Sequence, residues 1–432
     1  EFKSRRPIAV QAVRSGGEGK GPLSGFRGLV LTQAWAGTYA TEMLALLGAD
    51  VVQVEVRSRL DSWRGSYRNP IPRNLVNTDT ARRPWNCSPL YNSVNLNKRC
   101  ITIDLSTAEG KNLFNELLPH FDFVAENFSP RVMNQLGIGY DALTAIKPDI
   151  VFASLSAYGA TGPWANVPGI GGTIEPSSGM SSLLGYEGEQ PQNSGQMYPD
   201  PVAGLCGFAA IALALLHRDR TGEGQYIDLS MQEANFLFIG DAWMEYEING
   251  SVAGPRGNRH PLCAPHGIYP SSGDDKWVAI AAETELHWQI ICEVLEIDGR
   301  RWQSNEERKK HEDSIDGLLS VSTRKLDRDA LASELGGRGV PAAPVLSPAD
   351  VVVDAQLRER GHMIQVDHPE AGSMWQSGLP MLFSRTEGGV TRPAPTQGQH
   401  SFEVFEEFLG MGRQRYDELA KSGITGKGEI TR

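Results

Sequence analysis

The first 155 residues alternate between short apolar segments rich in β-branched residues and longer segments with the spacing of helices. Predicted strands lie at 28–32, 51–56, 100–105, 123–125 and 150–155, with helical segments between them. Repeated alternation of this kind favours an α/β fold with a parallel, doubly wound sheet. On such sheets, ligands bind beyond the carboxyl ends of the strands.

The later part of the chain holds a long irregular segment followed by further helices and strands. Within the first part of the chain, Ser106 and Glu109 form a capping box, which predicts the start of a helix there. The segment 157–201 is rich in Gly, Pro and Ser, and irregular segments of this length inside a domain usually carry function. An apolar helix is predicted over 202–217, and a strand over 225–229.

The composition excludes two classes of partner. The chain has 432 residues, of which 40% are apolar, and its net charge is −11. Its length predicts two or three domains at roughly 100–200 residues each. An acidic chain has no general attraction for nucleic acid or for an anionic membrane surface, so neither is expected as a partner. No uninterrupted apolar run approaches about 18 residues, so no membrane span is expected.

The N-terminus and the cysteines indicate a reducing compartment. Residues 1–21 lack a hydrophobic signal core and are expected to form a disordered leader. The five cysteines are scattered, odd in number and without CxxC spacing, so neither a zinc site nor a disulfide framework is expected. The chain is therefore expected to be cytoplasmic.

Several common catalytic signatures are missing from the sequence. Neither GxGxxG after a strand nor the phosphate loop GxxxxGK[ST] occurs. The nucleophile elbow GxSxG and the zinc motif HExxH are also missing. The sequence therefore predicts no metal site and no permanently bound cofactor, and it gives no support to hydrolase or nucleotide-dependent mechanisms.

The most distinctive local feature is the segment 195–204, GQMYPDPVAG, in which Asp200 lies between two prolines just before the apolar helix. Asp is a favoured helix N-cap, and Pro201 at the first helical position would support a purely structural cap. A carboxylate there would also lie beside exposed N–H groups and the positive end of the helix dipole. Such groups can stabilise an oxyanion during acyl transfer, so both roles remain open at this point.

Five stretches occur in a characteristic order: 37–55 (GTYATEMLALLGADVVQVE), 97–105 (NKRCITIDL), 126–137 (ENFSPRVMNQLG), 218–229 (RDRTGEGQYIDL) and 398–400 (GQH). Through their order and spacing, nearly the whole chain resembles the class III CoA-transferases, the family of formyl-CoA transferase and carnitine CoA-transferase. The stretch 172–185 and the YPDPVAG motif also resemble the branch that contains benzylsuccinate CoA-transferase, whose donor is succinyl-CoA.

The resemblance implies a covalent mechanism centred on Asp200, which occupies the position of the family nucleophile. Its carboxylate would attack a donor acyl-CoA thioester, and the released CoA thiolate would return to give an aspartyl-CoA thioester. The implied partners are an acyl-CoA donor, with succinyl-CoA as one candidate, and a carboxylic acid acceptor, so coenzyme A enters as a thioester substrate. With an ordinary pKa of about 4, the carboxylate would need no general base.

The resemblance also maps a CoA pocket onto this chain. Two family arginines fall on Val56 and Gln135, so the nearby Arg57 and Arg131 are the expected ligands of the CoA phosphates. The remaining matched positions are Gln33, Ile103, Ser106, Asn127 and Phe128.

Two alternatives to CoA transfer stay open. Racemases of α-methylacyl-CoA esters share the fold and use a His–Asp pair, but the histidine position reads Ile170 here, which disfavours proton shuttling. His260 and His266 are the nearest histidines in sequence. A non-catalytic subunit of a hetero-oligomeric CoA-transferase is the second alternative, and the presence of Asp200 disfavours it.

The resemblance further implies the architecture of the whole molecule. A large Rossmann-like, CoA-binding domain is expected from 22–217 and 340–432, with a smaller α+β domain from 225–335. Members of the family form interlocked dimers, so a homodimer is expected, and a heterodimer with a related subunit remains open.

Overall fold

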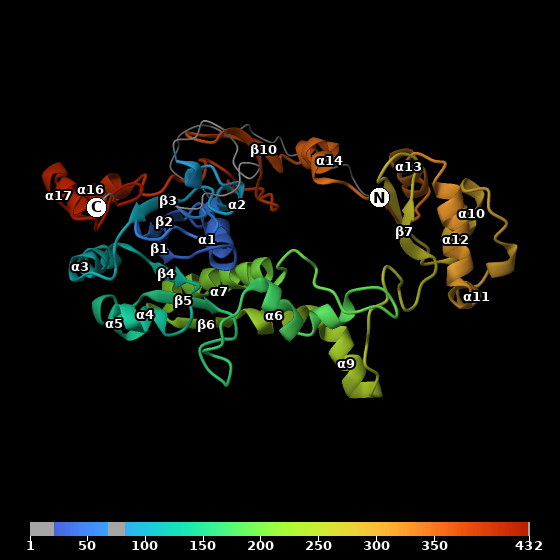
Figure 1. Ribbon diagram of the computed structural model, residues 1–432, viewed down its shortest axis with the longest axis horizontal. Helices are drawn as coiled ribbons and strands as arrows, with labels where there is room; N and C mark the ends of the chain where they lie inside the picture. Colours follow the sequence, from blue (N-terminus) through green and yellow to red (C-terminus); the bar gives the residue numbers. More distant parts are fainter. Residues whose placement is uncertain (1–20, 68–82, 431–432) are drawn as a thin grey trace. The chain divides into compact units, whose positions relative to one another are not determined.

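The computed structural model describes residues 21–67 and 83–430, so all of the predicted leader except Gly21 lies outside the described residues. The chain divides into two compact units (Figure 1). The larger unit contains the described residues up to Met180, then Asn193–Asp241, and the residues from Ala355 onward. The smaller unit contains Ser181–Gln192 and Ala242–Asp354.

The larger unit is built on a parallel sheet of six strands in the order β3-β2-β1-β4-β5-β6. This order reverses between β1 and β4, as in doubly wound nucleotide-binding folds, and the predicted α/β class is confirmed. The strands are β1 (Arg27–Leu31), β2 (Asp50–Glu55), β3 (Arg99–Thr102), β4 (Phe123–Glu126), β5 (Val151–Ser156) and β6 (Tyr226–Ser230).

Helices connect these strands and complete the larger unit. They are α1 (Ala36–Leu46), α2 (Pro89–Asn92), α3 (Ala108–Leu117), α4 (Val132–Leu136), α5 (Tyr140–Ile146), α6 (Gly171–Ser177), α7 (Pro199–Thr221), α8 (Met231–Phe236), α15 (Ala355–Glu359), α16 (Ser401–Leu409) and α17 (Arg413–Lys421). A separate antiparallel hairpin joins β10 (Met363–His368) to β11 (Gly372–Ser377). Helix α9 (Gly240–Asn249) runs from the larger unit into the smaller one.

Alternate residues of the sheet face two different cores, because successive side chains of a strand point to opposite faces. Leu29 of β1 belongs to a cluster with Phe114 of α3 and Phe405 of α16. Its neighbour Val30 belongs to a cluster with Leu44 of α1 and with α7 residues. The sheet is therefore covered on both faces, which explains why its strands read as continuous apolar runs.

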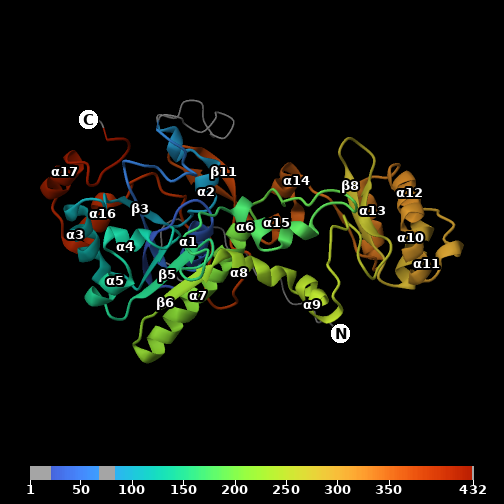
Figure 2. The same ribbon diagram turned by 60° about the horizontal axis from the view of Figure 1, so that its bottom comes forward.

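Helix α7 is longer than the predicted helix 202–217 at both ends. Among the described residues it is the one helix that is long and apolar enough to cross a membrane, as judged by length and composition. It packs against α1 and against β5 and β6, and Figure 2 shows it lying along these strands. These contacts bury one side of α7, while Leu213 on the helix is 65% exposed.

The smaller unit has its own sheet and its own core. Strands β7 (His266–Pro270), β8 (Trp277–Ala281) and β9 (Ala342–Pro344) form an antiparallel sheet in the order β7-β8-β9. Its helices are α10 (Glu285–Val294), α11 (Asn305–Lys310), α12 (Glu312–Thr323), α13 (Arg328–Gly337) and α14 (Pro348–Val353). Trp288, Leu319 and Leu335 are buried at its centre.

The boundaries of the two units differ from the predicted domain limits in three places. Residues Ser181–Gln192 were expected in the large domain but belong to the smaller unit. Residues 225–241 were expected in the small domain, but β6 pairs with β5 and therefore belongs to the large sheet. Residues 340–354 were expected in the large domain, but β9 pairs with β8 of the smaller unit. The last two differences arise from strand pairing between segments far apart in sequence, which local patterns do not report.

Candidate active site

Asp200 lies in the first turn of α7 and does not cap it. The helix begins at Pro199, its N-cap residue is Tyr198, and no side chain makes a capping hydrogen bond there. The sequence-based assignment of Asp200 as the N-cap is therefore wrong, because Pro199 rather than Pro201 takes the first helical position. The carboxylate is thus not used to cap its own helix.

The surroundings of Asp200 are apolar enough to change its ionisation. Its Oδ2 atom is buried and has no hydrogen-bond partner. Burial raises the pKa of this carboxyl to about 6, while hydrogen bonds from the backbone N–H groups of Ala36 and of Asp200 itself oppose that rise. The expected pKa of about 4 is therefore too low, but the group is still mostly ionised at pH 7.

Gly171, the first residue of α6, forms a wall of this site. A Cβ atom placed on Gly171 would lie 2.0 Å from Oδ2 of Asp200 and 2.6 Å from Cβ of Met197. No side chain fits in that space, so the backbone of α6 approaches the carboxylate directly. At the next residue, Gly172, a Cβ atom would meet nothing within 4 Å. The long segment predicted as an irregular loop thus contains a helix that touches Asp200.

The turn between β1 and α1 brings two predicted residues together. The backbone N–H of Gln33 donates to Oδ1 of Asn127 at 2.7 Å, and Nδ2 of Asn127 donates to the carbonyl oxygen of Gln33 at 2.8 Å. Asn127 follows β4, so this pair links the carboxyl ends of β1 and β4 where the strand order reverses. The N–H of Ala36, which hydrogen-bonds Asp200, belongs to the same turn.

Arg59 is a cation at this edge that the sequence analysis did not single out. Its Nη2 atom donates to Oε1 of Gln33 at 3.2 Å, and its side chain is otherwise exposed. Arg57, the predicted phosphate ligand, has a different environment. Its guanidinium donates to the backbone carbonyls of four residues in the C-terminal segment, Ala420, Thr425, Gly428 and Glu429.

The other predicted CoA-binding residues occupy varied environments. Ile103 is 1% exposed and belongs to the core beneath α3 and α16, so its side chain is a packing residue. Phe128 packs against the same core, and Arg131 is exposed at the N-cap of α4. Ser106 is exposed, and its hydroxyl donates to Oδ1 of Asp104 at 2.6 Å.

The predicted capping box at Ser106 and Glu109 is also wrong. The N-cap of α3 is Thr107, whose side chain accepts a hydrogen bond from the N–H of Gly110 at 3.0 Å. The helix starts one residue later than predicted, since Thr caps almost as well as Ser and both were available. This shift leaves the Ser106 hydroxyl outside the helix and close to the end of β3.

The position that would carry the histidine of a racemase lies at the start of α6. Ile170 is the N-cap residue of this helix and is 66% exposed. It has no titratable group for moving a proton. His260 and His266 lie within the smaller unit, with their ring centroids 5.4 Å apart.

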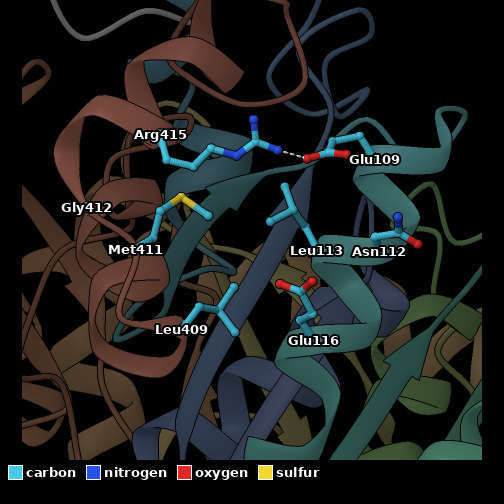
Figure 3. A pocket seen from close by; sticks show the side chains of 8 residues that line it. All are labelled: Glu109, Asn112, Leu113, Glu116, Leu409, Met411, Gly412 and Arg415. Carbon is cyan, nitrogen blue, oxygen red and sulfur yellow. Dashed lines mark hydrogen bonds and ion pairs between the residues drawn. The ribbon is translucent and has the colours of Figure 1, made fainter.

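A separate pocket of about 290 Å³ lies between α3 and the loop joining α16 to α17 (Figure 3). Arg415 and Glu109, which form an ion pair, line one side of it, and Glu116 lines the other (Figure 3). Helix α3 packs on the face of the sheet opposite to α1 and α7. The pocket is therefore distinct from the region around Asp200.

A doubly wound sheet with a buried carboxylate, one oxygen of which has no hydrogen-bond partner, is suited to covalent acyl transfer. The model of CoA-transferase family III matches residues 23–401. The chain therefore belongs to CoA-transferase family III and is an enzyme of this class, which confirms the resemblance found in the sequence.

Named relatives match over nearly their full length. A succinate–glutarate CoA-transferase of Agrobacterium fabrum is 29% identical over 90% of this chain and 96% of the relative. A succinyl-CoA–D-citramalate CoA-transferase of Chloroflexus aurantiacus is 29% identical over 92% of this chain and 96% of the relative. Among solved structures, a CaiB/BaiF family protein of Brucella suis has a TM-score of 0.81 at 29% identity, covering 90% of this chain and 100% of that one.

Proposed function

We propose that this enzyme moves CoA from succinyl-CoA to a second carboxylic acid, with Asp200 as the covalent nucleophile. The observation that carries the proposal is the state of the Asp200 carboxylate. One oxygen is buried without a partner, and the group is held by the backbone N–H of Ala36. A buried, desolvated carboxylate that is still ionised at neutral pH is a more reactive nucleophile than a hydrated one.

The reaction divides into two symmetrical halves. Oδ2 of Asp200 attacks the thioester carbonyl, the C–S bond breaks, and CoA leaves as the thiolate, which gives a mixed anhydride. The thiolate then attacks the aspartyl carbonyl, the donor acid leaves as a carboxylate, and an aspartyl-CoA thioester remains. The acceptor carboxylate attacks this thioester, and the returning thiolate attacks the acceptor carbonyl of the second anhydride, which restores Asp200.

The names of the relatives support the choice of donor and the class of acceptor. The relatives that name a donor name succinyl-CoA, and their acceptors are glutarate, D-citramalate or L-malate. All of these acids carry a second carboxylate. Arg59, which is oriented by Gln33 at the same edge as Asp200, supplies a cation for that carboxylate or for the CoA phosphates. We therefore propose a dicarboxylic acid as the acceptor.

The decisive experiment is mass spectrometry of the intact protein and its peptides after mixing with succinyl-CoA. The peptide containing Asp200 is expected to gain the mass of CoA, and hydroxylamine is expected to convert the adduct to a hydroxamate. Asp200→Ala should abolish both the adduct and the exchange of CoA. Asp219→Asn, at the exposed far end of the same helix, is the matched control and should retain both.

The same mixture distinguishes the alternative functions. A panel of glutarate, malate, citramalate and aromatic acids, including benzylsuccinate, identifies the acceptor by the CoA ester formed. A racemase would instead incorporate solvent deuterium at the α-carbon of an acyl-CoA with no acceptor acid present. A non-catalytic subunit would give neither result, and two of the relatives are named as alpha and beta subunits. Either outcome would refute the proposed transfer.

A further inference from the structure

Asp61 is a buried carboxylate that lies outside the predicted site and holds the turn between β1 and α1. Its exposed fraction is 3%. Its Oδ1 and Oδ2 atoms accept the backbone N–H of Ala34 at 3.2 and 3.1 Å, and Oδ1 also accepts the N–H of Trp63 at 2.8 Å. Asp61 thereby ties this turn to the loop that follows β2.

The conformation of Ala34 depends on this support. Its φ angle is 54°, in the left-handed region that residues with a Cβ atom rarely occupy. Such a conformation persists only where the surrounding structure fixes it, and strained residues of this kind cluster at functional sites. The hydroxyl of Thr38 adds a second restraint, since it donates to the carbonyl oxygens of Ala34 and Trp35 at 2.5 and 2.8 Å.

The restrained turn leads directly to Asp200. Ala36, two residues after Ala34, is buried in one apolar cluster with Val202 and Ala203 at the start of α7, and its backbone N–H lowers the pKa of the Asp200 carboxyl. Between them, the ring of Trp35 packs against the ring of Trp63 with their centroids 5.4 Å apart. A displacement of Ala34 therefore moves the N–H group that holds the nucleophile.

Asp61 is itself held on a rigid support. Arg64, three residues later, is completely buried, and its guanidinium makes a bidentate ion pair with Glu55 at the end of β2, with an Nη2–Oε1 distance of 2.8 Å. The ring of Tyr91 stacks on this guanidinium at 3.4 Å. The loop carrying Asp61 is therefore anchored to the central sheet.

We propose that Asp61 is a positioning residue for Asp200. By fixing the β1–α1 turn, it aims the N–H of Ala36 at the carboxylate and leaves Oδ2 free to attack the thioester. The proposal rests on the nucleophilic role proposed for Asp200, but the geometry that it asserts is present in the free enzyme. It can therefore be tested without any turnover.

The test is the titration of the Asp200 carboxyl in protein labelled with ¹³C-aspartate, with the resonance assigned by Asp200→Asn. The Ala36 N–H stabilises the ionised form, so its loss raises the Asp200 pKa. Asp61→Ala is expected to raise it by about 0.5–1 unit, and Asp61→Asn, which keeps one acceptor oxygen, by less. With succinyl-CoA, Asp61→Ala should lower kcat by roughly 10–100-fold while KM changes by less than about threefold.

The matched control is Asp122→Asn. Asp122 also accepts a backbone N–H, that of Arg27 at 2.7 Å, and it pairs with Arg218 near the C-terminal end of α7. It precedes β4 and so lies at the amino ends of the strands. This variant should leave both the Asp200 pKa and kcat unchanged. If Asp61→Ala does not fold, the isosteric Asp61→Asn decides the question.

The outcomes separate the two proposals. An unchanged Asp200 pKa and an unchanged kcat in a folded Asp61 variant would overturn the positioning role. A raised pKa in an enzyme whose wild type transfers no CoA would refute the proposed function and leave the positioning role intact.

Discussion

The Asp200 carboxylate is arranged for reaction at the expense of the folded state. Its Oδ2 atom is buried without a hydrogen bond, and burial raises the pKa of the carboxyl group from its ordinary value of 3.8 to about 6. A buried polar atom without a partner normally lowers stability, so its presence at a helix start that needs no cap is best explained by chemistry.

Asp200→Asn is expected to make the protein more stable at neutral pH. The pKa of the Asp200 carboxyl is higher in the folded state than in the unfolded state. The unfolding free energy of the wild type therefore falls as pH rises from about 4 to 6, because the unfolded chain loses this proton at lower pH than the folded protein does. The side-chain amide of the Asp200→Asn variant does not ionise, so the variant does not lose stability in this pH range. The variant should therefore be more stable than wild type by on the order of 2 kcal/mol at pH 7. Urea unfolding at pH 7 and at pH 4 measures this.

The difference in unfolding free energy between Asp200→Asn and wild type should nearly vanish at pH 4, where the side chain at this position is uncharged in both folded proteins. An equal difference at both pH values would show that burial of the charge is not its cause. Because the same variant removes the nucleophile, the more stable protein should also be inactive.

Gly171→Ala is expected to abolish most activity without unfolding the protein. The added Cβ atom would lie 2.0 Å from Oδ2 of Asp200, so the carboxylate must move. A shift of this size at a reacting atom is expected to lower kcat/KM by roughly 100-fold or more. Gly172→Ala is the control, since its Cβ atom meets open space, and near-equal activities of the two variants would contradict the close approach of α6.

At the scale of elements, the sequence predicts strands better than helix starts. The predicted strands 28–32 and 51–56 lie within one residue of β1 and β2 at both ends, because apolar and β-branched residues leave little ambiguity. Helix starts were displaced where two adjacent residues suit the same position, as with Pro199 and Pro201 or with Ser106 and Thr107. An error of one or two residues there changed the role assigned to Asp200.

The residues of the candidate site likewise divide into those that the sequence indicates and those that it does not. The family resemblance pointed to Asp200, and the structure joins two other predicted residues, Gln33 and Asn127, by a pair of hydrogen bonds. Asp61 and Gly171 had no sequence signal, since their importance lies in contacts with segments far along the chain. Contacts of this kind depend on the order of strands in the sheet, which local patterns leave undetermined.

Arg57→Ala is expected to loosen the C-terminal segment rather than to weaken CoA binding. Its guanidinium donates to four backbone carbonyls between Ala420 and Glu429, at 2.7 to 3.3 Å. Removing it leaves these acceptors unpaired, and we expect a loss of roughly 1–3 kcal/mol in unfolding free energy and faster proteolysis near the C-terminus. KM for succinyl-CoA should change by less than about threefold.

Arg59→Ala is the variant with which Arg57→Ala is compared. Its side chain is exposed and directed to Gln33, so this variant should leave stability unchanged and raise KM for an acyl-CoA or an acceptor acid. A large rise in KM for Arg57→Ala at unchanged stability would instead restore the role that the sequence predicted for Arg57.

At the scale of the whole molecule, we expect the chain to form a dimer in solution. Helix α7 packs against α8, yet Leu213 of α7 is 65% exposed, and Leu237, in the 3-10 helix that follows α8, is 73% exposed. Clusters of exposed apolar side chains on a folded protein usually mark an interface. Sedimentation at micromolar concentration should give twice the mass of the 47.2 kDa chain.

Leu213→Lys and Leu237→Lys should shift this equilibrium toward the monomer. Leu90→Lys, which changes an exposed leucine on α2, should not shift it. A wild-type protein that sediments as a monomer would refute the expected dimer, and a requirement for a second, different chain would favour the heterodimer.

The packing of α16 and α17 against the central sheet has a consequence for biosynthesis. Val404, Phe405 and Tyr416 complete the apolar cluster that begins with Leu29 of β1. During translation, α3, α4 and α5 therefore cover only part of this face, and the rest stays open until α16 and α17 have been synthesised. The growing polypeptide must be protected from aggregation until then, and a premature stop shortly before residue 400 would release a chain with a partly open hydrophobic face.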